Sequence, residues 1–176
     1  EIRYAYRHES RPFRPEPLLR GEATYFDHDA LIRATRLYTE PGLAFPMRFA
    51  AGEITPAAKV HQTLYRFNSN PAPLDNQEEI TVPSATLDGK LFFEREISHN
   101  EKALRQTVTP RLFYWHADYE KQSTLPTFDT EETAFSYPQL FRDSRFGSFD
   151  RIGDANQATA MLTSPSGRWS PANRGQ

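Results

Sequence analysis

The sequence of 176 residues predicts an all-β fold of antiparallel, up-and-down strands. Several stretches alternate apolar and polar side chains, which is the pattern of a strand whose two faces meet different surroundings. The chain also contains 13 Phe, 8 Tyr and 14 Pro. Aromatic residues together with helix breakers favour many short extended segments over long helices.

The N-terminal third predicts two strands after an irregular start. Residues 1–17 hold three prolines, which fit an edge, turn or entry segment better than a central strand. Residues 18–27 and 35–46 then alternate. One face of these two segments is apolar or small and carries Leu19, Gly21, Ala23, Tyr25, Leu37, Thr39, Leu43 and Phe45. Pro41 removes a ladder donor, so we expect a local gap or bulge there.

The middle of the chain predicts three more strands. Residues 54–67 alternate weakly, and residues of about 68–84 are so polar that they predict a long exposed loop. Clear alternation returns at 85–96 and at 106–116, which form the best-defined hairpin of the chain. In both, an apolar face lies opposite one that carries Asp88, Lys90, Glu94, Glu96 and Arg111.

A second long loop is predicted at about 117–154, before a last strand at 155–163. Leu125, Phe128, Phe135 and Tyr137 are its predicted apolar anchors. In its final part, arginines and aspartates alternate with Phe141, Phe146 and Phe149, and a purely solvated loop would not need these aromatic side chains. We therefore expect a packed loop with internal ion pairs.

Two environments are implied by strands with one apolar and one charged face. A soluble β-sandwich would place the charged face in bulk water, whereas a wide membrane barrel would place it in a water-filled lumen and the apolar face in lipid. Strands of about ten residues are long enough to cross a bilayer when tilted. Periodicity alone leaves both possibilities open, although short connections alternating with long ones favour the barrel.

The composition and motifs argue against several other classes. A net charge of −2 gives no basic footprint for nucleic acid, and the chain has no Cys. Glu94 and Glu96 share one strand face, whereas glycoside hydrolysis needs carboxylates across a cleft. The His residues lack ligand spacing, and no nucleophile elbow or phosphate loop is present. We predict no catalytic residue, no metal site and no cofactor.

Several segments resemble the LptD family of outer-membrane barrels, which assemble lipopolysaccharide. They occur in the family's order over residues 33–163, and the most specific lie at 140–143, 150–152 and 155–157. Further matching segments are 34–37, 40–41, 45–46, 88–90, 93–95 and 106–111. Order and spacing together are more specific than any single short motif.

The resemblance implies that residues 1–176 are a central fragment of a large transmembrane β-barrel in the outer membrane of a Gram-negative bacterium. The family's periplasmic N-terminal domain, which receives lipid from an LptA-type bridge, would lie outside this chain, as would the remaining strands and the lateral gate. The fragment would belong to a transporter and not to an enzyme.

The resemblance also implies a partner. In this family an LptE-like lipoprotein plugs the barrel lumen, and the loop that corresponds to residues 139–157 folds into that lumen. The positions carried over as partner or lumen-loop candidates are Arg142, Asp143, Asp150, Arg151, Asn156 and Gln157.

Two rival interpretations stay open at this point. One is another outer-membrane channel, such as a porin, whose lumen would conduct solutes. The other is a soluble carbohydrate-binding β-sandwich with Tyr114, Trp115 or Trp169 as stacking platforms.

Overall fold

The computed structural model describes residues 2–7, 14–27, 33–68, 76–99, 102–122, 125, 128–129 and 136–168. The strands are β1 (Ile2–Arg7), β2 (Glu16–Phe26), β3 (Ala34–Ala44), β4 (Met47–Phe49), β5 (Gly52–Phe67), β6 (Gln77–Leu91), β7 (Phe93–His99), β8 (Lys102–Ala117), β9 (Ala155–Thr163) and β10 (Ser166–Arg168). One short 3-10 helix, η1 (Tyr137–Phe141), follows β8. In the described part of the chain no helix is long and apolar enough to cross a membrane.

All described strands belong to one antiparallel sheet of up-and-down topology. The order is β1, β2, β3, β5, β6, β8, with β9 and β10 both paired to the far side of β8. β6 and β7 form one long strand interrupted at Phe92, and β3 continues into β4 after Phe45 and Pro46. This confirms the predicted all-β, up-and-down fold.

The strands are strongly staggered across the sheet. The strand made of β6 and β7 pairs with β5 through Gln77–Leu91 on one side, but with β8 through residues 84–90 and 93–99 on the other. The hydrogen-bonded pairing with β8 is therefore shifted along this strand relative to the pairing with β5. Such a shift is what strands tilted around a barrel axis require.

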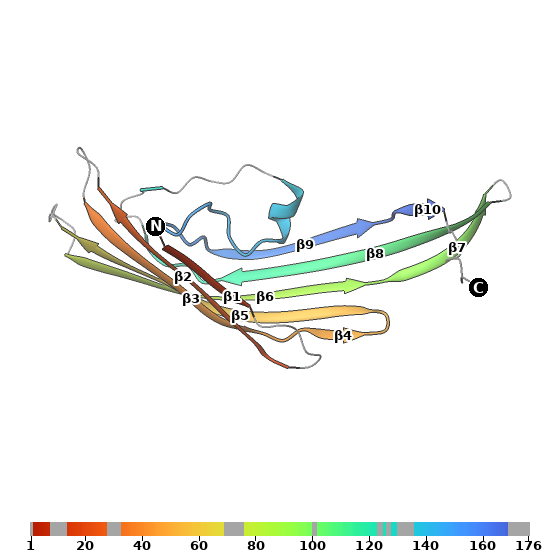
Figure 1. Ribbon diagram of the computed structural model, residues 1–176, viewed down its shortest axis with the longest axis horizontal. Helices are drawn as coiled ribbons and strands as arrows, with labels where there is room; N and C mark the ends of the chain where they lie inside the picture. The colour runs from red at the N-terminus through yellow and green to blue at the C-terminus, as the bar shows by residue number, and fades with distance from the viewer. Residues whose placement is uncertain are drawn as a thin grey trace, which may run out of the picture.

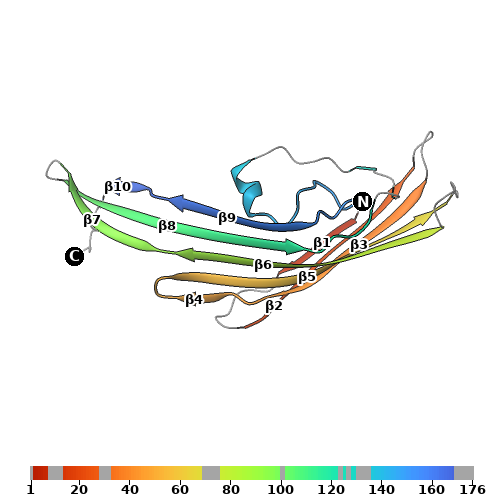
Figure 2. The same cartoon turned by 180° about the vertical axis from the view of Figure 1, so that it is seen from behind.

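The sheet is curved, and the described parts of the segment between β8 and β9 lie over its concave side (Figures 1 and 2). We call this segment, residues 118–154, the inner loop, and the sheet face beneath it the inner face. The opposite side is the outer face. The end of the sheet where Ala50 and Ala51 connect β4 to β5 is the turn end, and the end where the inner loop leaves β8 is the loop end.

An apolar cluster joins the inner loop to the loop end of the sheet. It contains Ala34, Tyr65, Phe67, Ile80, Val82, Phe113, Trp115, Ala117, Leu125 and Ala155, with Phe128, Phe141 and Ile152 packed against it. Leu125 and Phe128 thus confirm their predicted role as anchors. Tyr137 does not, because 78% of it is exposed. Phe135 lies outside the described residues.

One sequence prediction about the sheet needs correction. Residues 77–83, predicted as loop, form the first part of β6, because Ile80 and Val82 face the inner cluster while their neighbours point outward. The N-terminal segment, predicted as an edge, turn or entry segment, contains the edge strand β1, paired to β2. The gap expected at Pro41 is confirmed: the ladder between β3 and β5 has no pairs at residues 40 and 41 and keeps its register.

Gly52 gives the first testable prediction. A Cβ atom built at Gly52 would overlap the backbone oxygen of Lys90 and approach Leu91 Cδ2 to 2.9 Å, so Gly52→Ala should lower the free energy of unfolding by roughly 1–3 kcal/mol. The measurement is the unfolding midpoint in denaturant of the full-length protein folded in detergent. Gly89→Ala is the matched control, since its Cβ would meet nothing closer than 3.8 Å. Equal midpoints for both variants would contradict the prediction.

Candidate functional site

The guanidinium of Arg36, from the middle of the sheet, holds the inner loop to the inner face. Its side chain is 0% exposed. Nη1 donates to Asp150 and, at 2.7 Å, to Asp129 of the loop, while Nη2 donates to Glu22 of the neighbouring strand at 2.7 Å. One cation thus joins two sheet strands to two positions of the loop.

Asp150 is the central residue on the loop side of this cluster, and its side chain is also 0% exposed. Besides Arg36, it accepts the phenol hydrogen of Tyr65 at 3.0 Å. Its second oxygen accepts the backbone amides of Phe128 and Asp129, each at 2.8 Å. A buried carboxylate requires several donors to offset its lost hydration, and here both oxygens have them.

Asp129 completes this cluster at its more exposed side. Partial burial raises the pKa of this carboxyl, but hydrogen bonds, chiefly from Arg36 and also from Ser148, outweigh burial and hold the pKa below its usual range. The carboxylate is therefore ionised and paired at neutral pH.

A second polar cluster lies beside the Arg36 cluster on the inner face, closer to the turn end of the sheet. Tyr38 donates its hydroxyl to Glu40 and lies 2.8 Å from His61 Nδ1, and His61 Nε2 lies 2.8 Å from the hydroxyl of Ser84. Lys59 donates to Glu40 at 2.9 Å and to Asp143 of the inner loop at 2.5 Å. This cluster gives the loop a second charged attachment to the sheet.

Aromatic stacking supplements both attachments. Phe128 stacks on Phe26 with ring centroids 4.3 Å apart. Phe149 stacks on Tyr38 at 3.9 Å, with the guanidinium of Arg20 4.5 Å from its ring. The loop is therefore packed as well as ion-paired.

Phe149 provides the second testable prediction. Phe149→Ala removes the stack on Tyr38 and the contact with Arg20, and because the ring is only half-buried we expect a cost of about 1–3 kcal/mol. The measurement is the rate at which a protease cuts the inner loop of the folded protein, which should rise severalfold. Tyr137→Ala, a truncation at a 78% exposed ring in the same loop, is the control. Equal cleavage rates in the two variants would show that the stack does not hold the loop.

The sequence-predicted site residues fall into different places. Asp143, Asp150 and Arg151 are tied inside the molecule, and Arg151 donates to the backbone oxygens of Gln122 and Leu125. Arg142 is exposed at the surface of the loop.

The two residues of the last predicted strand lie apart from this loop. Asn156 accepts from Tyr114 at 2.9 Å in an exposed contact, and Gln157 donates to Thr159 at 3.3 Å on the inner face. The structure therefore brings Asp143, Asp150 and Arg151 together around the loop and leaves Arg142, Asn156 and Gln157 outside its attachments.

Sequence reasoning missed the residues on the sheet side of these attachments. Alternation alone places Arg36 on the polar face of its predicted strand, yet its contacts with Asp129 and Asp150 span 93 and 114 residues of sequence. The available signal was an arginine within an alternating strand, with Glu22 on the inner face of the neighbouring strand. Trp115, a candidate carbohydrate platform, is only 3% exposed beneath the loop.

The outer face has the opposite character. Its exposed large side chains include Leu19, Leu37, Leu43, Phe45, Val60, Leu87, Leu91, Leu112 and Leu162. Large hydrophobics are thus exposed on one face while charged side chains are buried beneath the other. An exposed apolar surface of this extent indicates contact with another apolar phase.

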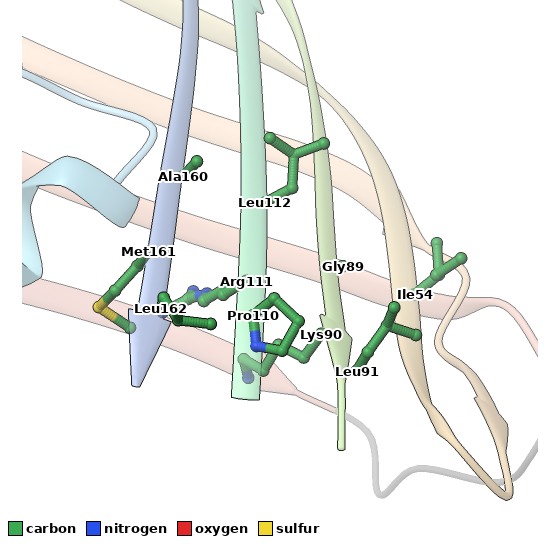
Figure 3. Close-up of a pocket in the computed structure, with 10 residues that line it drawn as sticks. All are labelled: Ile54, Gly89, Lys90, Leu91, Pro110, Arg111, Leu112, Ala160, Met161 and Leu162. Atoms are coloured by element: carbon green, nitrogen blue, oxygen red, sulfur yellow. The ribbon is translucent and has the colours of Figure 1, made fainter. Parts of the chain in front are cut away.

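A groove of about 570 Å³ marks this face near the turn end. Its floor contains Gly89, Pro110 and Ala160, while Leu91, Leu112, Leu162 and Ile54 stand around it (Figure 3). In the described part of the chain, no group of three or more His, Asp or Glu side chains is arranged to hold a metal ion.

Comparison with known proteins identifies the family. The sequence profile described as LptD, LPS transport system D, matches residues 1–174. Proteins named LPS-assembly protein LptD are 38% identical over 146 residues in Nitrosomonas europaea, 35% over 164 residues in Pseudomonas aeruginosa and 39% over 148 residues in Shewanella denitrificans. These alignments cover 82%, 86% and 82% of this chain but only 20%, 18% and 19% of the relatives. The chain thus spans about a fifth of its relatives' length, and it belongs to the LptD family.

Proposed function

We propose that this chain is a section of an outer-membrane β-barrel whose whole protein assembles lipopolysaccharide into the outer leaflet of a Gram-negative bacterium. The observation that carries the proposal is the distribution of side chains: leucines are exposed on the outer face, and Arg36 and Asp150 are buried under a loop on the inner face. That the assembled molecule is lipopolysaccharide is inferred from family membership. The protein acts in transport and not as an enzyme.

The dimensions of the outer face support this proposal. Along β3 and Phe45, which follows it, residues 35 to 45 face outward at alternate positions, and Phe45 is 45% exposed at the turn end. Ten steps of about 3.3 Å give roughly 33 Å along the strand, or about 25 Å across the bilayer at a tilt of about 40°. A lipid-facing apolar band of a barrel has about this height.

On β6, the outward side chains show where the apolar band ends toward the loop end of the sheet. The outward residues at its loop end, Gln77, Glu79 and Thr81, are polar, whereas those nearer the turn end, Ala85, Leu87 and Leu91, are apolar or small. In our proposal the loop end of this strand extends beyond the hydrocarbon, on the outer surface of the cell.

Open edges support the idea that residues 1–176 are a partial barrel domain. In the described part of the chain, β1 pairs only with β2, and β9 pairs only with β8. Lipid cannot satisfy the unpaired backbone groups of these edges, so further strands must close the barrel. We place those strands, and a periplasmic N-terminal domain that meets an LptA-type bridge, in the remainder of the whole protein.

The inner loop is the surface that we propose for an LptE-like lipoprotein plug. Arg142 is exposed on the loop, whereas Asp143, Asp150 and Arg151 fix the loop's shape from beneath. Charge reversal at Arg142 should therefore weaken plug binding directly. Reversal at Asp150 or Arg151 should weaken it by releasing the loop, and unchanged co-purification of the plug in all three variants would count against this assignment.

Depletion of the full-length protein tests the proposed function. Newly made lipopolysaccharide should fail to reach the cell surface and should return when the wild-type protein is supplied, as measured by surface labelling. Normal surface lipopolysaccharide in depleted cells, together with lost permeability to small solutes, would instead identify a porin-like channel.

A further inference from the structure

A cavity of about 400 Å³ lies on the inner face, between η1 and the turn end of the sheet. Its lining combines apolar and charged side chains. The apolar part includes Leu18, Pro46, Phe113 and Phe141, and the charged part includes Glu16, Arg48, Glu53, Lys59, Asp88, Lys90 and Asp143. The cavity is separate from the Arg36 cluster, whose residues do not line it.

The charged groups around this cavity are paired, with one exception. Lys59 binds Asp143, Lys90 donates to Glu53 at 2.9 Å, and Arg111 donates to Asp88 at 2.7 Å. The guanidinium of Arg48, which is largely exposed, lies 3.6 Å from Glu53. These cations are thus already engaged with acidic partners.

Glu16 is the exception. The residue is only 7% exposed, and its Oε1 atom has no hydrogen-bond partner among the described residues, nor does any described cation pair with it. A carboxylate removed from water without a partner loses its hydration and gains nothing in return, which destabilises the folded protein. Such a cost is offset when a cationic group enters the cavity.

The lining indicates which kind of cation fits. A metal ion would need several oxygen ligands, but the other carboxylates of the cavity are held by Lys59, Lys90 and Arg111. A lysine or arginine side chain needs one carboxylate for its head and apolar surface for its stem. Glu16 supplies the first, and Leu18, Pro46, Phe113 and Phe141 supply the second.

We propose that this cavity receives a lysine or arginine side chain of a polypeptide that lies inside the barrel, and that Glu16 is its ion-pair partner. The inference rests on the proposed function only in taking the inner face to line a lumen. It names a contact at the turn end, distant from the exposed Arg142 of the inner loop.

Photo-crosslinking of the full-length protein in outer membranes tests this contact. A photoreactive residue in place of Leu18, which lines the same cavity, should crosslink to a second polypeptide within a few residues of a lysine or arginine. Because losing one member of a buried ion pair is costly, Glu16→Lys should lower the crosslinking yield by about tenfold or more. Glu120→Lys, a reversal at an exposed glutamate after β8, is the control and should leave the yield unchanged.

Folding is checked by the heat-dependent gel shift of a closed barrel, and Glu16→Gln replaces Glu16→Lys if the reversed variant does not fold. Equal yields with and without the carboxylate would overturn the inference, as would crosslinks confined to the same chain. So would a yield that falls in wild-type membranes treated with a chelator, which would indicate a metal ion. These outcomes are read from the crosslink, whereas the proposed function is tested by the amount of lipopolysaccharide at the cell surface after depletion. A failure of one proposal can therefore be distinguished from a failure of the other.

Discussion

Replacing Arg36 by methionine is expected to release the inner loop from the sheet. The substitution keeps an unbranched side chain but leaves Glu22, Asp129 and Asp150 without their shared cation. Removing one member of a buried ionic cluster costs roughly 3–5 kcal/mol, because the remaining charges stay out of water unpaired. The loop should become accessible to protease, and its cleavage rate in the folded full-length barrel should rise by at least about a hundredfold.

A matched variant separates this effect from a general loss of positive charge. Arg48→Met removes an arginine whose side chain is 67% exposed and whose carboxylate contact is 3.6 Å long, so it should leave the loop protected. If Arg36→Met left the loop as resistant to protease as Arg48→Met does, the ionic cluster would not be what holds it.

Introducing a charge on the outer face is expected to block membrane assembly. Leu112 lies near the middle of β8, points outward and is 53% exposed, so in our account its side chain contacts lipid. An arginine there would cost roughly 2–4 kcal/mol near the bilayer midplane. Leu112→Arg should therefore shift the unfolding transition of the protein in lipid vesicles by that amount and lower the level of folded protein in outer membranes.

The control for this prediction is a charge just beyond the strand. Tyr119, two residues after the end of β8, is 73% exposed, and Tyr119→Arg should assemble normally. In a soluble protein, by contrast, both substitutions would replace an exposed apolar group by a charge and would be tolerated. Equal stability of the two variants in vesicles would exclude lipid contact at Leu112.

The sheet was largely predictable from the sequence because alternation is a local signal. A residue such as Leu37 or Leu112 faces the same side as its neighbours two positions away, whatever the partner strand. The signal failed at residues 77–83, where outward polar residues beyond the apolar band resemble a loop. There, Ile80 and Val82 on the inner face were the only apolar residues, and the long strand β5 supplied the pairing.

Only the loop residues of the candidate site could be predicted from the sequence, and their partners on the sheet could not. The aspartates of the inner loop stood out because they alternate with arginines and aromatics, and Asp150 is indeed central. Its partners Arg36 and Tyr65 could not be deduced, since a contact across 114 or 85 residues depends on how the loop folds back over the sheet. Arg151, which also belongs to this loop, donates to the backbone oxygens of Gln122 and Leu125, and these bonds likewise depend on how the loop folds.

The buried ionic cluster is better understood as a device that fixes geometry than as a source of stability. Charges taken out of water repay their hydration only with good partners, and an apolar replacement of the whole cluster is often tolerated in other proteins. Here it sets where Phe128, Phe149 and the exposed Arg142 lie relative to the sheet. A loop placed in this way offers a partner in the lumen a defined surface.

The central claim is that the outer face lies in lipid and the inner face meets water. Single cysteines in the full-length protein, on a background without other free thiols, test this directly with a membrane-impermeant maleimide applied to outer membranes. Cysteine at Leu87 or Leu112 should remain unlabelled, and cysteine at Thr86, which lines the inner cavity, should be labelled. Rapid labelling of the two outer positions with protection of Thr86 would contradict the account, because the apolar face would then lie in water.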